Sequence, residues 1–192
     1  SLIMLIACIL ATSLIAGCIS GDGDDNGDET PTEYEGTLED LLIPKESVPG
    51  PFMPNYTTEH ITDYTLVFGE SVEAEDVGFK DAYAASSVYV TEGDFGIFGE
   101  IVIRIDPAKL GDTYDTYTEA NITDDEDSWT EVEVERIGDR TFAAKISDEQ
   151  SESSMYQLVF TKKDILVTIL MTGGEDTMDT LLSYGKDVAA SI

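Results

Sequence analysis

The chain has 192 residues, with 40 Asp and Glu against 10 Lys and Arg, and its formal net charge at pH 7 is −30. A surface this acidic repels nucleic acid and anionic lipid headgroups, so the composition argues against DNA or RNA binding and favours solubility in high salt. Hydrophobic residues make up 42% of the chain, which is enough for the core of one ordinary domain.

The chain opens with an apolar run that ends in small residues before a cysteine. No charged residue occurs from Leu2 to Ile19, and the run closes with Ile15-Ala16-Gly17-Cys18. An apolar stretch that ends in small residues is typical of a secretory signal peptide. At about 1.5 Å per residue the run is also long enough to remain as an uncleaved membrane anchor. Both alternatives stay open.

This tetrapeptide resembles the lipobox of bacterial and archaeal lipoproteins, and the acid excess adds to an archaeal-like impression. The resemblance implies cleavage after Gly17 and attachment of lipid to Cys18. Residues 1–17 are thus expected to be a lipoprotein signal peptide or an N-terminal membrane anchor. The protein is then expected at the cell surface, on the outer face of the cytoplasmic membrane. Because the chain begins at Ser1 without a basic stretch, we expect further residues upstream.

Residues 18–40 are expected to form the lipidated cysteine and a disordered acidic tether. The stretch from Gly21 to Asp40 holds nine acids and no base, and it cannot bury enough apolar surface to offset its ordering entropy. Four oxygen-bearing residues in it have the spacing of a calcium-binding loop. They are Asp22, Asp24, Asn26 and Glu33. No helix can enter this loop and Pro31 lies within it, so we expect an acidic spacer and no cofactor.

The rest of the chain, residues 41–192, is expected to be a single α+β extracytoplasmic domain. A short helical turn is predicted near residues 37–43, followed by irregular structure across the prolines of residues 44–54. N-glycosylation sequons begin at Asn55 and Asn121, both in predicted loops.

Alternating apolar and polar residues predict strands from Ile61 onward. The predicted strands are residues 79–90, 97–105, 129–137, 141–146, 155–162 and 165–172. The last of these is apolar on both faces, so we expect it in the centre of the sheet. Amphipathic helices are predicted to begin at Asp106 and Asp176, and each can cover an opposite face of the sheet. The apolar side of the second helix is expected to comprise Met178, Leu181, Leu182, Val188 and Ile192.

The order β-β-α-β-β-β-β-α with hairpin-length turns predicts an antiparallel β-sheet covered by helices, an α/β sandwich of the α+β class. Over residues 79–192 this order resembles small exported α+β domains of the PsbP and LpqN type. The resemblance rests on element order alone, so it transfers no functional residue.

Sequence motifs for catalysis are scarce. His60 is the single histidine, which argues against a histidine-based metal cluster, and no P-loop, nucleophile elbow or dinucleotide fingerprint occurs. The carboxylates at residues 124–127 fit a solvated loop or a cation site. Several tyrosines fit core packing or the lining of a ligand groove. They are Tyr64, Tyr83, Tyr89, Tyr114, Tyr117 and Tyr156.

We therefore expect a membrane-anchored extracytoplasmic lipoprotein that acts as a non-catalytic binding or structural module. Its expected partners are the membrane, through the N-terminal lipid or anchor helix, and an unidentified protein or small molecule. The alternative is a carboxylate- or metal-dependent extracytoplasmic hydrolase.

Overall fold

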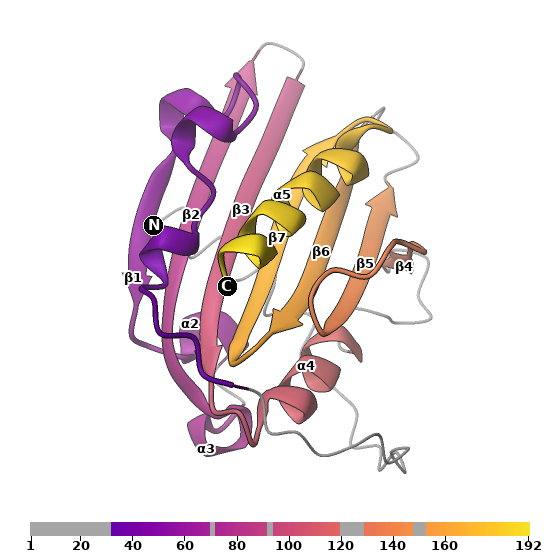
Figure 1. The fold of residues 1–192 in the computed structure, drawn as a ribbon. Helices are drawn as coiled ribbons and strands as arrows, with labels where there is room; N and C mark the ends of the chain where they lie inside the picture. The colour runs from indigo at the N-terminus through magenta and orange to yellow at the C-terminus, as the bar shows by residue number, and fades with distance from the viewer. Residues whose placement is uncertain (1–31, 70–71, 92–93, 120–128, 148–152) are drawn as a thin grey trace.

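Seven antiparallel strands form a single sheet (Figure 1). The computed structural model describes residues 32–69, 72–91, 94–119, 129–147 and 153–192. The strands lie side by side in the order β1-β2-β3-β7-β6-β5-β4, and every neighbouring pair is antiparallel. Their bounds are β1 (Thr57–Ile61), β2 (Phe79–Thr91), β3 (Asp94–Ile105), β4 (Thr130–Glu131), β5 (Arg140–Ser147), β6 (Ser154–Lys162) and β7 (Ile165–Gly173).

Two longer helices cover opposite faces of this sheet. Helix α5 (Thr177–Ser191) packs on β6 and β7 on one side, which we call the α5 face. Helix α4 (Leu110–Glu119) packs on the same strands from the other side, the α4 face. The antiparallel α+β fold expected from the sequence is therefore confirmed. The shorter helices are η1 (Glu39–Leu41), η2 (Lys45–Ser47), η3 (Met53–Asn55), α2 (Thr65–Phe68) and α3 (Ala74–Val77).

Strand β7 lies in the middle of the sheet, between β3 and β6. Ile165 and Val167 are buried on the α5 face, and Leu166 and Leu170 are buried on the α4 face. Side chains alternate between the two faces of a strand, so a strand covered on both sides must be apolar throughout. The predicted central position of this strand is confirmed.

Helix α5 lies close to the sheet because a glycine faces the strands. A Cβ at Gly185 would lie 2.7 Å from Cδ2 of Leu158 and 3.1 Å from Cδ1 of Ile137, so a larger residue would push the helix outward. Leu181 has no exposed surface, as predicted, whereas Leu182 is only half-buried. Successive helix positions differ by about 100°, and this turns Leu182 to the edge of the apolar stripe.

The predicted strand over residues 129–137 is mostly irregular. Only Thr130–Glu131 pair as β4, and Val132 adds one hydrogen bond to the carbonyl of Ala143. The chain then leaves the sheet and buries Ile137 on the α5 face. Strand β1 was not predicted, because four of its five residues are exposed and polar. An edge strand of this kind has no buried face to impose an apolar pattern.

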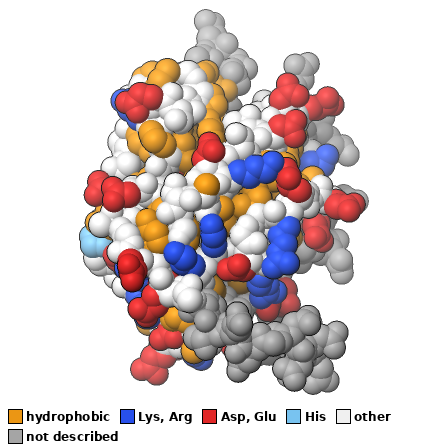
Figure 2. Space-filling model, viewed as in Figure 1, with side chains coloured by type: hydrophobic (Ala, Val, Ile, Leu, Met, Phe, Trp, Pro, Cys, Tyr) orange, Lys and Arg blue, Asp and Glu red, His pale blue; other side chains and the backbone are white. Residues whose placement is uncertain are grey.

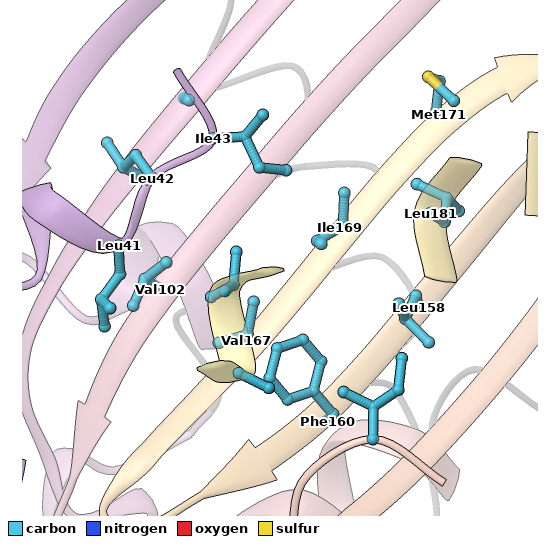
Figure 3. Close-up of a cluster of buried hydrophobic side chains, with 14 of the residues drawn as sticks. Leu41, Leu42, Ile43, Val102, Leu158, Phe160, Val167, Ile169, Met171 and Leu181 are labelled. Atoms are coloured by element: carbon cyan, nitrogen blue, oxygen red, sulfur yellow. The ribbon is translucent and has the colours of Figure 1, made fainter. Parts of the chain in front are cut away.

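A segment without strand structure covers the part of the α5 face that α5 leaves open. This segment, residues 34–56, runs across β1, β2 and β3, and we call it the strap (Figure 1). In Figure 3 its Leu41 lies beside Val102 of β3, and Leu42 and Ile43 follow further along the strap. Six strap side chains are buried in the core of this face: Leu38, Leu41, Leu42, Ile43, Val48 and Phe52.

The strap corrects the expected boundary between tether and domain. The disordered tether was predicted to reach Asp40, but residues 34–40 are packed on the domain. Leu38 is 2% exposed, and the backbone N–H of Tyr34 is hydrogen-bonded to the buried Asp164. The composition is acidic, but the charged side chains of Glu39 and Asp40 remain in solvent while their backbone stays on the sheet. The apolar N-terminal run and residues 18–31 lie outside the described residues.

Candidate functional site

The site residues expected from the sequence fall mainly outside the described residues. Those are Cys18, Asp22, Asp24, Asn26 and Asn121. Glu33 is described, and its Oε1 lies 3.7 Å from Nζ of Lys80 in an exposed ion pair. Within the described ranges, no group of three or more potential metal ligands comes together. The calcium loop, the lipidated cysteine and the second sequon stay predictions.

Asn55 ends helix η3 and is exposed. Its Nδ2 donates a hydrogen bond of 2.8 Å to the carbonyl of Val88. A glycan on Nδ2 would replace one of the two amide hydrogens, and the other could keep this bond. The sequon at Asn55 is thus accessible, and its use stays a prediction.

A buried carboxyl group lies where the strap meets the sheet. Glu100 of β3 has no exposed surface, and its Oε2 accepts a hydrogen bond of 2.8 Å from the N–H of Ile43. Its Oε1 has no hydrogen-bond partner among the described residues. Burial penalises the charged form more than this one bond stabilises it, and it raises the pKa of Glu100 to about 8. At neutral pH the carboxyl therefore keeps its proton.

Tyr56 binds the other backbone polar group of Ile43, its carbonyl. Its hydroxyl donates a hydrogen bond of 2.5 Å to the carbonyl of Ile43. Burial, with Glu100 and Glu46 nearby, raises the pKa of Tyr56 to about 12, so the phenol keeps its hydrogen. Side chains thus satisfy both backbone groups of Ile43, in place of the strand ladder that this segment lacks.

Aromatic rings surround the strap. The ring of Phe52 lies 5.0 Å from that of Tyr89 and 6.1 Å from that of Phe98, measured between centroids. Phe98 also contacts the rings of Tyr56 and Tyr184. The six tyrosines considered for core packing or a ligand groove do not form one surface. Tyr83, Tyr89 and Tyr156 pack on the α5 face, and Tyr64, Tyr114 and Tyr117 pack on the α4 face. Figure 2 shows apolar side chains across the middle of the α5 face, with basic side chains among them and acidic side chains mostly toward its outline.

A buried ion pair fixes the start of the strap. The carboxylate of Asp164, which is 1% exposed, accepts a hydrogen bond of 2.6 Å from the N–H of Tyr34. Arg104 lies beside it, with its Nε 3.5 Å from Oδ2 of Asp164. The same guanidinium donates to the carbonyls of Tyr34 and Gly36 at 3.1 and 3.0 Å. These contacts join the entering chain to the end of β3 and the β6–β7 turn.

The single histidine belongs to an exposed pair on the sheet edge. His60 is close in sequence to Asp63, but its Nε2 lies 2.6 Å from Oδ1 of Asp81, and its ring stacks on Tyr83. Asp63 instead accepts hydrogen bonds from Thr65 at the start of α2. The described residues bring no nucleophile and no second acid to His60, so this pair supplies only part of a catalytic arrangement.

Two further features of the fold could receive a ligand, and neither is well formed for one. An open depression of about 480 Å³ next to α3 carries Lys80 and Lys109 but also Glu75 and Asp106, so it selects neither sign of charge. The second is Gln157 on the α4 face, which donates a hydrogen bond of 3.3 Å to Thr168. Gln157 is buried, so it offers no surface to a ligand.

Glu100 was not singled out in the sequence analysis, although a signal for it exists. Phe98 and Val102 flank it at alternate positions of a strand, so the alternation already places the carboxyl on an apolar face. A carboxyl that follows an apolar pattern in register is expected to be buried and to have a raised pKa. The strap that covers it has no such periodicity.

The comparisons with known proteins add a likeness of fold. No protein-family model matches the chain, and a search of curated proteins finds no match. Among solved structures, the chain is similar to the extracellular domain of PknH from Mycobacterium tuberculosis, with a TM-score of 0.53 and 11% identity. The match covers 85% of this chain and 100% of that domain. At this identity the likeness shows a shared fold.

Proposed function

We propose that the chain is a lipid-anchored extracytoplasmic module that binds a partner or supports a structure at the cell surface, without catalysing a reaction. The observation that carries this proposal is the apolar run ending in Ile15-Ala16-Gly17-Cys18. The extracellular location of the PknH domain with the same fold supports it. The described residues include no helix long and apolar enough to cross a membrane.

The strap fits an anchored protein because it ties the start of the domain to the sheet. Fifteen residues lie between Cys18 and Tyr34, so an extended chain reaches at most about 55 Å between a lipid on Cys18 and the Arg104–Asp164 pair. The domain would stay near the membrane surface. Any pull on the tether would reach the exposed Glu33–Lys80 pair first and then this buried pair.

A hydrolase is the weaker candidate. Glu100 is the carboxyl whose pKa burial raises, as a general acid would require, but it has no exposed surface beneath the strap. A substrate would have to displace the strap to reach it. Glycosidase-type chemistry also needs a second carboxylate, and Asp164 is already paired with Arg104.

Protease accessibility in intact cells tests the proposed location. A peptide tag placed after Ile192 should be removed by protease added outside the cells, whereas a cytoplasmic protein with the same tag should resist until the cells are lysed. Protection of the tag in intact cells would contradict an extracytoplasmic module.

A further inference from the structure

The strap is held on the sheet in the way that a bound peptide is held. Among the described residues, every hydrogen bond between two backbone groups of this segment stays within the strap. No such bond joins the strap backbone to the backbone of the sheet. Its contact with the α5 face therefore consists of buried apolar side chains, of hydrogen bonds between strap backbone and side chains outside the strap, and of the bond from Asn55 to the carbonyl of Val88.

In the part of the chain that the structure describes, five side chains outside the strap bind strap backbone atoms. Glu100 accepts a hydrogen bond of 2.8 Å from the N–H of Ile43. Ser87 donates to the carbonyl of Phe52 at 2.5 Å, and Tyr184 donates to the carbonyl of Ser47 at 2.6 Å. The other two are Asp164 and Arg104, at Tyr34 and Gly36. Carbonyl groups occur in every residue and N–H groups in all but proline, so these contacts recognise a polypeptide with little regard to its sequence.

The apolar contacts define the side chains that this surface accepts. The strap buries its hydrophobic residues against Ala85, Phe98 and Val102, while its charged Lys45 and Glu46 stay exposed. The surface therefore suits a segment whose apolar side chains face the sheet while its charged side chains stay in solvent.

The contact between the strap and the sheet is least stable near the middle of the strap. One oxygen of the fully buried Glu100 has no hydrogen-bond partner among the described residues, and an unsatisfied buried polar atom destabilises the contact that encloses it. A segment without ladder bonds opens locally at lower free energy than the strands beneath it.

We propose that the strap is an exchangeable occupant, and that the surface it leaves binds a segment of another polypeptide that lacks strand structure and turns apolar side chains toward the sheet. This rests on the proposed function as a binding module and names its partner class. The strap then competes with the partner from within the chain, at an effective concentration in the millimolar range.

A fluorescent peptide of residues 36–56 tests this by anisotropy on the full chain in detergent. The double variant Leu41→Ala/Leu42→Ala weakens the internal strap and leaves the surface intact. It should bind the peptide saturably and roughly tenfold or more tightly than the wild type does. A peptide carrying the same two alanines is the control and should bind much more weakly.

Tyr184→Phe, added to the sensitised chain, removes the hydroxyl that donates to Ser47 and should weaken peptide binding several-fold. Tyr64→Phe, on the α4 face, is the matched control and should have no effect. If the double variant lacks the wild-type circular dichroism spectrum, the single variants Leu41→Ala and Leu42→Ala replace it.

The proposal is overturned if folded sensitised chains bind both peptides equally, or if Tyr184→Phe does not change binding. Dimers detected by light scattering in place of peptide binding would also overturn it, in favour of strap exchange between two copies. This experiment does not depend on lipid at Cys18. A negative result would therefore count against this binding surface and not against the proposed lipid anchor.

Discussion

The backbone N–H of Ile43 donates a hydrogen bond to the carboxyl of Glu100 across 2.8 Å, where neither side chain has more than 3% of its surface exposed. The pKa of Glu100 rises from 4.5 in its ordinary state to about 8 in the folded chain. Between these two values the unfolded chain loses this proton while the folded chain keeps it. The contribution of Glu100 to stability is therefore greatest below pH 4.5, falls as the pH rises to about 8, and is level above it.

The variant Glu100→Gln should remove this pH dependence. A neutral amide keeps an oxygen for the N–H of Ile43, so the variant should gain stability relative to the wild type between pH 5 and 8, by a few kcal/mol at the upper end. Urea denaturation across this range measures it. Glu59→Gln, at an exposed position of β1, is the control. Parallel pH profiles for wild type and Glu100→Gln would contradict the buried neutral carboxyl.

Ile43 and Glu100 also show how much of the structure the sequence can predict. Regular alternation identifies most of the sheet, including the central β7, because burial on both faces leaves an apolar run such as Ile165 to Met171. The strap has no repeat, since prolines and 3-10 turns hold it, and its position depends on side chains distant in sequence. Glu100 could be placed on an apolar face, but what covers it could not.

Arg104→Ala should loosen the start of the strap. The substitution removes donors to two carbonyls and leaves the buried Asp164 without its countercharge, which costs on the order of 3–5 kcal/mol. Urea denaturation gives the loss of stability, and cleavage by a glutamate-specific protease at Glu35 and Glu39 should become faster.

The matched control for this pair is Arg140→Ala. Arg140 pairs with Asp115 on the surface, where an ion pair contributes about 0–1 kcal/mol. Equal losses for the two arginine variants would show that the Arg104–Asp164 pair does not anchor the strap.

Leu181→Ala should destabilise the domain by about 2–5 kcal/mol, because this side chain is fully buried between α5 and the sheet. Leu182→Ala should cost clearly less, since Leu182 is half-buried at the edge of the same stripe. Chemical denaturation of both variants checks the orientation of α5. A larger loss at Leu182 would mean that the helix is rotated from the position described.

The melting temperature of the protein should rise with monovalent salt. A net charge of −30 causes repulsion within the folded state, and salt screens it. Calcium at matched ionic strength should add little, with weak heats that do not saturate in calorimetry. Saturable micromolar binding that is lost in Asp22→Ala/Asp24→Ala would instead make the N-terminal acidic stretch a calcium site.

The mass of the chain extracted from membranes tests the proposed anchor most directly. When the chain is expressed with a basic signal-peptide start added before Ser1, the protein should begin at Cys18 and carry lipid on that residue, whereas Cys18→Ala should remain unprocessed and unlipidated. Two acyl chains would give stable attachment, and one alone only marginal binding. Recovery of a full-length chain with an unmodified Cys18 would contradict the lipoprotein and favour an uncleaved anchor helix.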